Sequence, residues 1–228
     1  MDAAKADLMR ALGRLARGLS TLFWCLPLAL AAQVATGRAD WVGFMGAFAF
    51  APALLLTAML WHGLRLLRDF QKQERVWQQA LDRAEFLAVV NTGLSPFLFW
   101  WHRFPLVPSY IVCVDLLAVS ALLFLMQINR VLLRLSAMLP DEMLRSEART
   151  FTGLNLWLLL GVLAGFAVDR VFGRLPGAPR LMGGFSFPMQ QTATFLALLV
   201  ALTPVATTLA LLWKIKEAIF TGLFDTER

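Results

Sequence analysis

The sequence predicts an all-α membrane protein, a polytopic bundle of six transmembrane helices that form three hairpins with both termini in the cytoplasm. Composition is the first observation behind this class. Of the 228 residues, 59% are hydrophobic and only 16% are charged, whereas soluble domains carry about 25% charged residues. So much apolar surface does not fit inside one soluble core, so lipid is expected to cover the rest. The second observation is that apolar segments recur along the chain with basic residues gathered between alternate pairs.

Six segments approach the roughly 20 apolar residues that a spanning helix needs. They cover residues 19–36, 41–61, 86–101, 106–127, 151–168 and 192–213, within one membrane domain over residues 1–228. A basic stretch, residues 1–18, precedes them, and its Leu8, Leu12 and Leu15 recur at helical spacing. We therefore expect this stretch to be an amphipathic N-terminal helix that lies along the membrane surface.

The basic residues predict the orientation. With the N-terminus inside, all but five of the 21 lysines and arginines fall on the cytoplasmic side; the exceptions are Arg38, Arg103, Arg170, Arg174 and Arg180. This bias favours six spans in a bacterial inner membrane. It also explains the net charge of +6 without a nucleic acid partner. The alternative is that segment 86–101, short and interrupted by Asn91 and Pro96, re-enters instead of spanning, which would invert everything after it and weaken the bias.

Two cytoplasmic connections, residues 62–85 and 128–150, are expected to be helical extensions of the spans. The first carries a heptad-like stripe and must turn between Asp69 and Gln79, where polar residues are densest. In the second, Pro140 interrupts the helix, and acidic residues follow it in the first turn of a new helix. The stripe of the first connection consists of Gly63, Leu67, Phe70, Glu74, Trp77, Leu81 and Ala84.

Two interpretations of these helical hairpins remain open. Their apolar stripes either pack on each other and on the lipid headgroups, or form a docking surface for another protein. The candidate docking residues are Arg68, Lys72, Arg75 and Trp77.

Asp115 is the one acidic residue well inside an apolar run, where an ionisable group is costly and suggests a function. It could relay protons, bind a cation or pair with a basic residue of a partner subunit. The structural alternative is that it locks helix packing against Asn91 or Asn155. Those two asparagines are themselves candidate intramembrane residues, although such side chains more often join helices than bind ligands.

No catalytic, cofactor or metal site is expected. His62 and His102 would lie near opposite membrane faces, roughly 30 Å apart, and therefore cannot share a haem or a metal ion. Cys25 and Cys113 are also expected near opposite faces, which argues against a disulfide. The motifs of zinc proteases, serine hydrolases and P-loop proteins are absent from the sequence. We therefore do not expect an enzyme.

Two functions from different classes remain. The first is a non-catalytic integral membrane subunit or scaffold of a larger inner-membrane complex, whose cytoplasmic hairpins dock other membrane or cytoplasmic subunits, or a second copy of the chain. The second is a small permease or an ion or proton channel that uses Asp115. Prolines inside the expected spans favour a shaped interior; they are Pro27, Pro52, Pro96 and Pro204.

A faint threefold similarity of the hairpin starts also fits a transport protein, since internal repeats are common there. The three starts are Gly18-Leu19-Ser20, Gly93-Leu94-Ser95 and Gly153-Leu154-Asn155. Chance resemblance between apolar helices is the alternative.

Overall fold

The fold was obtained as a computed structural model that describes residues 2–37, 46–71, 73–139, 141–172 and 187–225. All the regular elements in this part of the chain are helical, as the sequence predicts. In chain order they are α1 (Asp2–Gly37), the short 3-10 helix η1 (Gly46–Phe48), α3 (Ala51–Leu67), α4 (Arg75–Arg103), α5 (Pro108–Met138), α6 (Glu142–Phe172) and α7 (Phe187–Asp225).

Three described helices are long and apolar enough to cross a membrane. They cover Met9–Gly37, Pro108–Met138 and Glu142–Val168, and Ala51–Leu67 is a shorter apolar helix. These three helices identify the chain as a membrane protein. The number of spans and their orientation remain predictions from the sequence.

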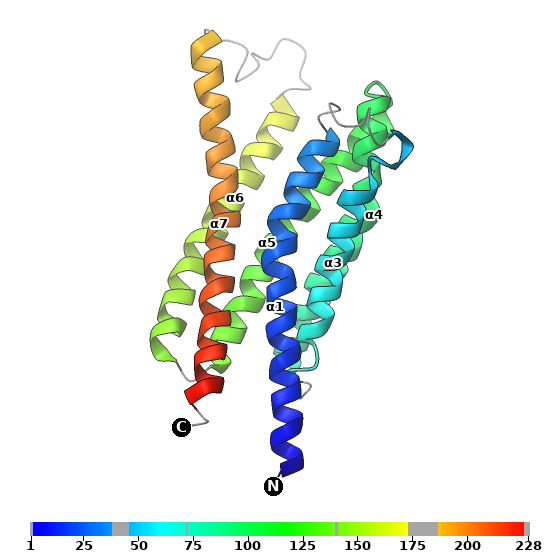
Figure 1. The fold of residues 1–228 in the computed structure, drawn as a ribbon. Coiled ribbons are helices and arrows are strands. Elements are labelled where there is room, and N and C mark those ends of the chain that lie inside the picture. Colours follow the sequence, from blue (N-terminus) through cyan, green and yellow to red (C-terminus); the bar gives the residue numbers. More distant parts are fainter. Residues whose placement is uncertain (1, 38–45, 72, 140, 173–186, 226–228) are drawn as a thin grey trace.

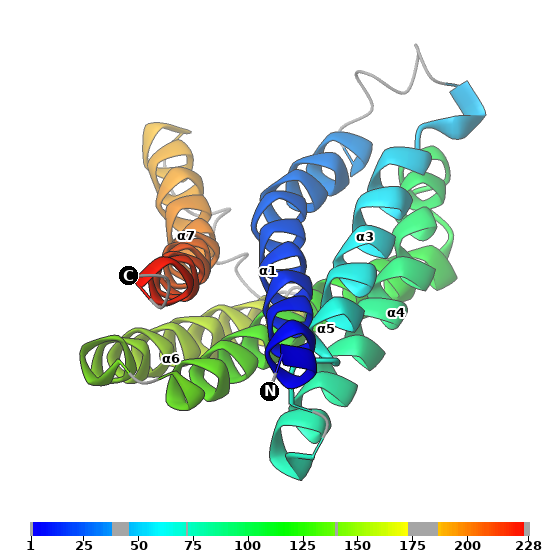
Figure 2. The same cartoon turned by 60° about the horizontal axis from the view of Figure 1, so that its bottom comes forward.

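The long helices run alternately up and down (Figure 1), so that α1 begins and α7 ends at the same end of the bundle. The α3–α4 and α5–α6 connections lie at this end too, which we call the N/C end. Helices α1 and α5 lie between the α3–α4 pair and the α6–α7 pair (Figure 2). Both central helices also contact α4 and α7.

The basic N-terminal stretch is not a separate surface helix. Helix α1 runs without a break for 36 residues, a length of about 54 Å at 1.5 Å per residue. Because a straight continuation cannot lie flat while the following segment crosses a bilayer, the first turns of α1 extend the bundle along its axis. Leu15 is fully buried in the core, and Arg14 pairs with Asp69 at 2.5 Å, which fixes this end of α1 beside the end of α3.

The second expected span lies partly outside the described residues. Its regular part starts at Ala51, whereas the apolar segment begins at Trp41, and residues 38–45 lie outside the described part of the chain. Pro52 occupies the first turn of α3. Backbone N–H groups in a first turn make no hydrogen bond within the helix, so the N–H that proline lacks is not needed there. Pro52 therefore starts this helix and does not interrupt it, in contrast to Pro27, Pro96 and Pro204, which lie inside α1, α4 and α7.

Both connections at the N/C end are short turns between long helices. Helix α3 ends at Leu67 and α4 begins at Arg75, so the first turn overlaps the expected range. Helix α5 ends at Met138 and α6 begins at Glu142, on either side of Pro140, which lies outside the described residues. The carboxylate of Asp141 accepts a hydrogen bond from the Leu144 N–H at 3.0 Å, which caps α6.

The core is richest towards the N/C end and includes residues of the two connections that were expected to be helical extensions of the spans. The stripe of the first connection is buried at five of its seven positions, Gly63, Leu67, Trp77, Leu81 and Ala84. Leu67, Trp77, Leu81 and Ala84 belong to one buried cluster with residues such as Leu132 and Leu135 of α5 and Ile215 of α7. The stripe therefore packs within the chain's own bundle.

Helices α1 and α3 approach most closely where Gly18 faces Gly63. A Cβ atom on Gly18 would lie 2.8 Å from the Gly63 carbonyl oxygen and 2.3 Å from a methyl group of Leu67. Only glycine fits such a backbone approach. The two other glycines of the threefold similarity, Gly93 and Gly153, have open space around that position, so the three glycines are not in equivalent surroundings.

Gly18→Ala is expected to destabilise the protein by about 1–3 kcal/mol, because the added methyl group would push α1 away from α3. The control is Gly13→Ala on the same helix, where nothing lies within 4 Å of the new methyl. That change should stabilise by about 0.5–1 kcal/mol through backbone entropy. Unfolding of purified protein in mixed micelles measures both. Equal effects of the two substitutions would contradict the close α1–α3 contact.

Candidate functional site

Among the polar side chains inside the described bundle are three groups that join neighbouring helices. The largest joins α5, α6 and α7 around Asn155, which is fully buried. Its Nδ2 donates to Asn129 Oδ1 at 3.0 Å, to Thr208 Oγ1 at 2.9 Å and to the Pro204 carbonyl oxygen at 3.1 Å. Asn129 Nδ2 also donates to Thr208 Oγ1 at 2.9 Å. This group is an interhelical clamp of the kind that membrane helices use.

The second group joins α4 and α5. Ser120 Oγ donates to Asn91 Oδ1 at 2.6 Å, and both residues are buried. Asn91 is thus held in place by Ser120 and not by Asp115. The sequence analysis considered Asn91 or Asn155 as the packing partner of Asp115. In the structure neither residue has that role.

The third group is an ion pair between Asp115 of α5 and Arg170 of α6. Arg170 Nη2 lies 2.8 Å from Asp115 Oδ1, and the guanidinium also lies 5.1 Å from the centre of the Phe166 ring. The Asp115 side chain is largely buried, at 17% exposure, while Arg170 is 43% exposed. The cation that faces Asp115 therefore comes from the same chain, and the pair joins α5 to α6 near the end opposite the N/C end.

Asp115→Asn is expected to cost about 1–2 kcal/mol of stability, between the values for exposed and buried ion pairs, because Arg170 is half exposed. Exchanging the charges with Asp115→Arg and Arg170→Asp should restore part of this loss, since a structural pair needs opposite charges and no fixed order. Unfolding in micelles measures the set, with Arg170→Gln as the second single variant. If the exchanged pair were no more stable than the single variants, Asp115 would not be holding α5 and α6 together.

The candidate docking residues of the first connection lie in different environments. Trp77 is fully buried, so its ring belongs to the core and is not presented to a partner. Arg68 is bound within the connection, where it pairs with Asp82 and lies 3.6 Å from Glu85. Arg75 is exposed, and Lys72 lies outside the described residues.

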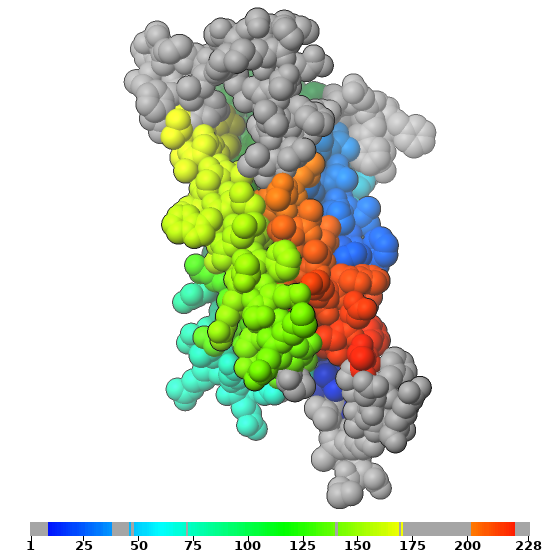
Figure 3. Space-filling model, turned by 90° about the vertical axis from the view of Figure 1, so that its left-hand side faces the viewer, coloured from blue at the N-terminus to red at the C-terminus, as the bar shows by residue number. Residues whose placement is uncertain are grey.

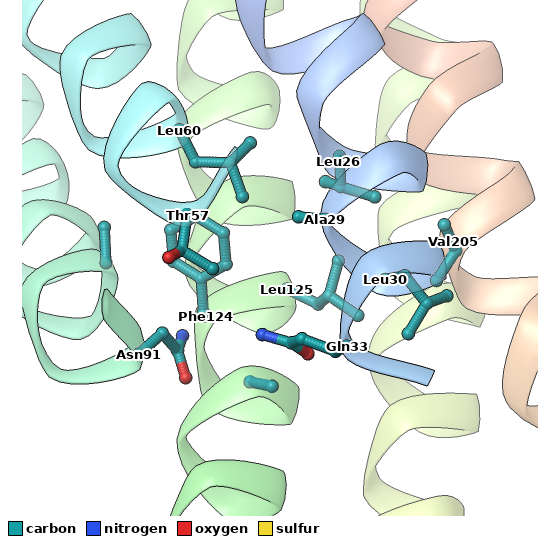
Figure 4. A pocket seen from close by; sticks show the side chains of 12 residues that line it. Leu26, Ala29, Leu30, Gln33, Thr57, Leu60, Asn91, Phe124, Leu125 and Val205 are labelled. Atoms are coloured by element: carbon teal, nitrogen blue, oxygen red, sulfur yellow. The ribbon is translucent and has the colours of Figure 1, made fainter. Parts of the chain in front are cut away.

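The bundle contains a central cavity of about 70 Å³ between α1, α3, α4, α5 and α7 (Figure 4). Most of its wall is apolar, formed by residues such as Leu26, Phe124 and Val205. Gln33 of α1 and Asn91 of α4 supply amide groups that point towards one another across the space. The cavity therefore brings two side-chain amides from different helices to one mostly apolar space.

The sequence singles out Asn91 and also indicates Gln33 as a polar residue that joins helices, but it does not predict which residues surround them. Gln33, Thr57 and Ser120, which share this region with Asn91, come from three other helices. Asn129, Thr208 and Arg170 were missed in the same way. Each lies in an apolar run or at its end, and the only available signal was a polar residue at that depth.

The remaining candidates for chemistry are separated in the fold. His62 lies near the N/C end of α3 and His102 in the last turn of α4, which is at the opposite end of the bundle. Cys25 on α1 and Cys113 on α5 are free thiols. Within the part of the chain that the structure describes, no three histidine, cysteine or acidic side chains come close enough to hold a metal ion.

Comparison with known proteins gives no relative: no protein-family model, no curated protein and no solved structure matches this chain.

Proposed function

We propose that the chain is a non-catalytic integral membrane subunit or scaffold of a larger complex in a bacterial inner membrane. Its buried polar groups support this proposal, because the Asn155 group and the Asp115–Arg170 pair hold helices of the same chain together. In this proposal the six apolar segments all span the membrane, with both termini inside. The basic residues of the N/C end then face the cytoplasm.

One observation carries the proposal, the outer face of α6. Leu154, Trp157, Gly161, Gly165 and Val168 follow one another at spacings of three and four, and all are exposed. The Trp157 ring is 75% exposed, and nothing lies within 4 Å of a Cβ built on either glycine. Figure 3 shows that α6 forms an outer surface of the bundle beside α7.

This face suits another helix better than lipid tails alone. Small residues four apart let a second helix come close enough for extensive backbone contact, which lipid chains do not exploit in the same way. The partner is another membrane subunit or a second copy of the chain. This surface replaces the stripe of the first connection as the docking surface, since the stripe is buried within the bundle.

The test is the particle mass after extraction of the protein with its surrounding lipid into polymer nanodiscs. We expect a mass above that of one chain for the natural protein, and a single-chain mass for Gly161→Ile, whose side chain would fill the approach to α6. The matched control is Gly93→Ile, at an exposed helix glycine of α4 that also has open space around it. A fully stable natural protein that occurs only as a single chain would contradict the subunit role.

A small permease is the second candidate, and the central cavity favours it. A passage for solutes needs polar groups inside an otherwise apolar bundle, and Gln33 and Asn91 supply them here. The Asp115–Arg170 pair does not favour proton or cation transport through Asp115, since its carboxylate already faces a cation. The sequence analysis considered a permease or channel that uses Asp115. Flux into proteoliposomes, compared between the natural protein and Asp115→Asn, tests that hypothesis.

A further inference from the structure

The amides of the central cavity have hydrogen-bonding groups that no side chain of the described structure uses. Asn91 Oδ1 accepts the Ser120 hydroxyl, but Asn91 Nδ2 donates to no described group, although the residue is only 5% exposed. The orientation of the amide does not change this, since turning it over leaves the oxygen facing the cavity instead. Gln33, which is only partly buried, also makes no side-chain hydrogen bond within the described residues.

Buried polar groups without partners are rare in folded proteins, because each one costs free energy unless a bound molecule satisfies it. The groups here point into a space of about 70 Å³, whereas one water molecule needs about 10–15 Å³ of such space. The cavity therefore has room for several waters, or for one molecule of a few heavy atoms. Thr57 lines the same space, and its hydroxyl already donates to the Ala53 carbonyl at 2.9 Å, which leaves its oxygen free to accept.

The chemistry of the wall selects the kind of ligand. No charged side chain lines the cavity, so an ion would lose its hydration without compensation. An apolar molecule would leave the two amides unpaired. A small neutral molecule with both a donor and an acceptor satisfies them. Gln33 offers an NH₂ group and a carbonyl oxygen, and Asn91 offers the NH₂ group that its hydrogen bond with Ser120 does not use.

We propose that the cavity is a binding site for a small neutral polar molecule, of the size and hydrogen-bonding pattern of formamide or urea, held between Gln33 and Asn91. Primary amides match these side chains because a carbonyl oxygen and an NH₂ group on one small molecule pair with the same groups of an amide side chain. Binding of this kind is independent of the subunit role proposed above.

Nuclear magnetic resonance of protein labelled with ¹⁵N at its asparagine and glutamine side chains tests the proposal, with formamide as the probe. We expect saturable shifts of the Gln33 and Asn91 side-chain signals, and no saturable shift of Asn155, which does not line the cavity and whose NH₂ group is already bonded. Gln33→Leu and Asn91→Leu should each weaken formamide binding about tenfold, the effect of about 1.4 kcal/mol. The matched control, Gln79→Leu at an exposed position of α4, should leave binding unchanged.

Two results would overturn the proposal. In the first, shifts rise linearly with formamide at all amides alike, which means solvent effects without a site. In the second, the Gln33 and Asn91 protons exchange magnetisation with bound water that formamide does not displace, which means that the cavity takes water only. Because Asn91 also bonds Ser120, Asn91→Leu can disturb the fold, and Gln33→Leu then decides alone, since Gln33 has no such partner.

Discussion

Trp77→Ala is expected to destabilise the protein by about 3–5 kcal/mol, the cost of removing a fully buried aromatic side chain. Trp77 is the largest fully buried side chain of the described structure and belongs to the same buried cluster as Leu67 of α3 and Leu135 of α5. Its removal would leave a void where these three helices meet. Unfolding in mixed micelles measures the loss directly.

A neighbouring residue provides the control. Val76 is 46% exposed on the same turn of α4, so Val76→Ala should change stability by less than about 0.5 kcal/mol. Trp77→Phe should fall between the two, because it keeps a ring and removes an indole N–H that has no partner among the described residues. If Trp77→Ala instead left stability unchanged and removed a bound protein, the docking role first considered for this residue would be correct.

Trp77 also shows what a sequence pattern can and cannot predict. The apolar positions of the heptad-like stripe lie on the buried faces of two helices, Gly63 and Leu67 on α3 and Trp77, Leu81 and Ala84 on α4, because burial selects side chains at i, i+3 and i+4. Spacing does not state what covers these faces. A stripe that packs on its own chain and a stripe that binds a partner have the same sequence, and only the fold places Leu81 and Ala84 against the rest of the bundle.

Asp115 shows the same limit at longer range. Its depth in an apolar run predicted that it needs a partner, which is a local inference from the cost of burying charge. Arg170 is 55 positions away at the end of another apolar segment, and the positive-inside count treated it only as an exception. The pairing depends on the packing of α5 against α6. Hydropathy along the sequence does not predict which helices pack together. The central cavity is harder still, because five helices contribute to it.

The helices extend beyond the predicted spans for a simpler reason. Hydropathy marks where lipid-compatible residues begin and end, whereas a helix continues as long as its backbone is satisfied and its side chains find contacts. Helix α4 therefore begins at Arg75, eleven residues before its expected apolar segment, and carries Trp77 and Leu81 into the core.

Asn155→Leu is expected to destabilise the bundle by about 1–3 kcal/mol, because a residue of similar size replaces the donor that serves α5, α6 and α7 together. The substitution would leave Asn129 Oδ1 without its described partner. The control is Thr150→Val on the same helix, whose exposed hydroxyl bonds only the Ser146 carbonyl of its own helix. That change should cost less than about 0.5 kcal/mol.

The double variant Asn129→Leu with Asn155→Leu separates a clamp from two independent residues. Removing both partners of a buried hydrogen bond is less costly than removing one, because no polar group is left unpaired between them. We therefore expect the double variant to lose less stability than the two single variants together, with a coupling of about 0.5–2 kcal/mol. Additive losses in micelle unfolding would show that the two asparagines act separately. A measured coupling would mean that Asn129 and Asn155 serve the assembly of the bundle, in contrast to Gln33 and Asn91, whose amides line the central cavity.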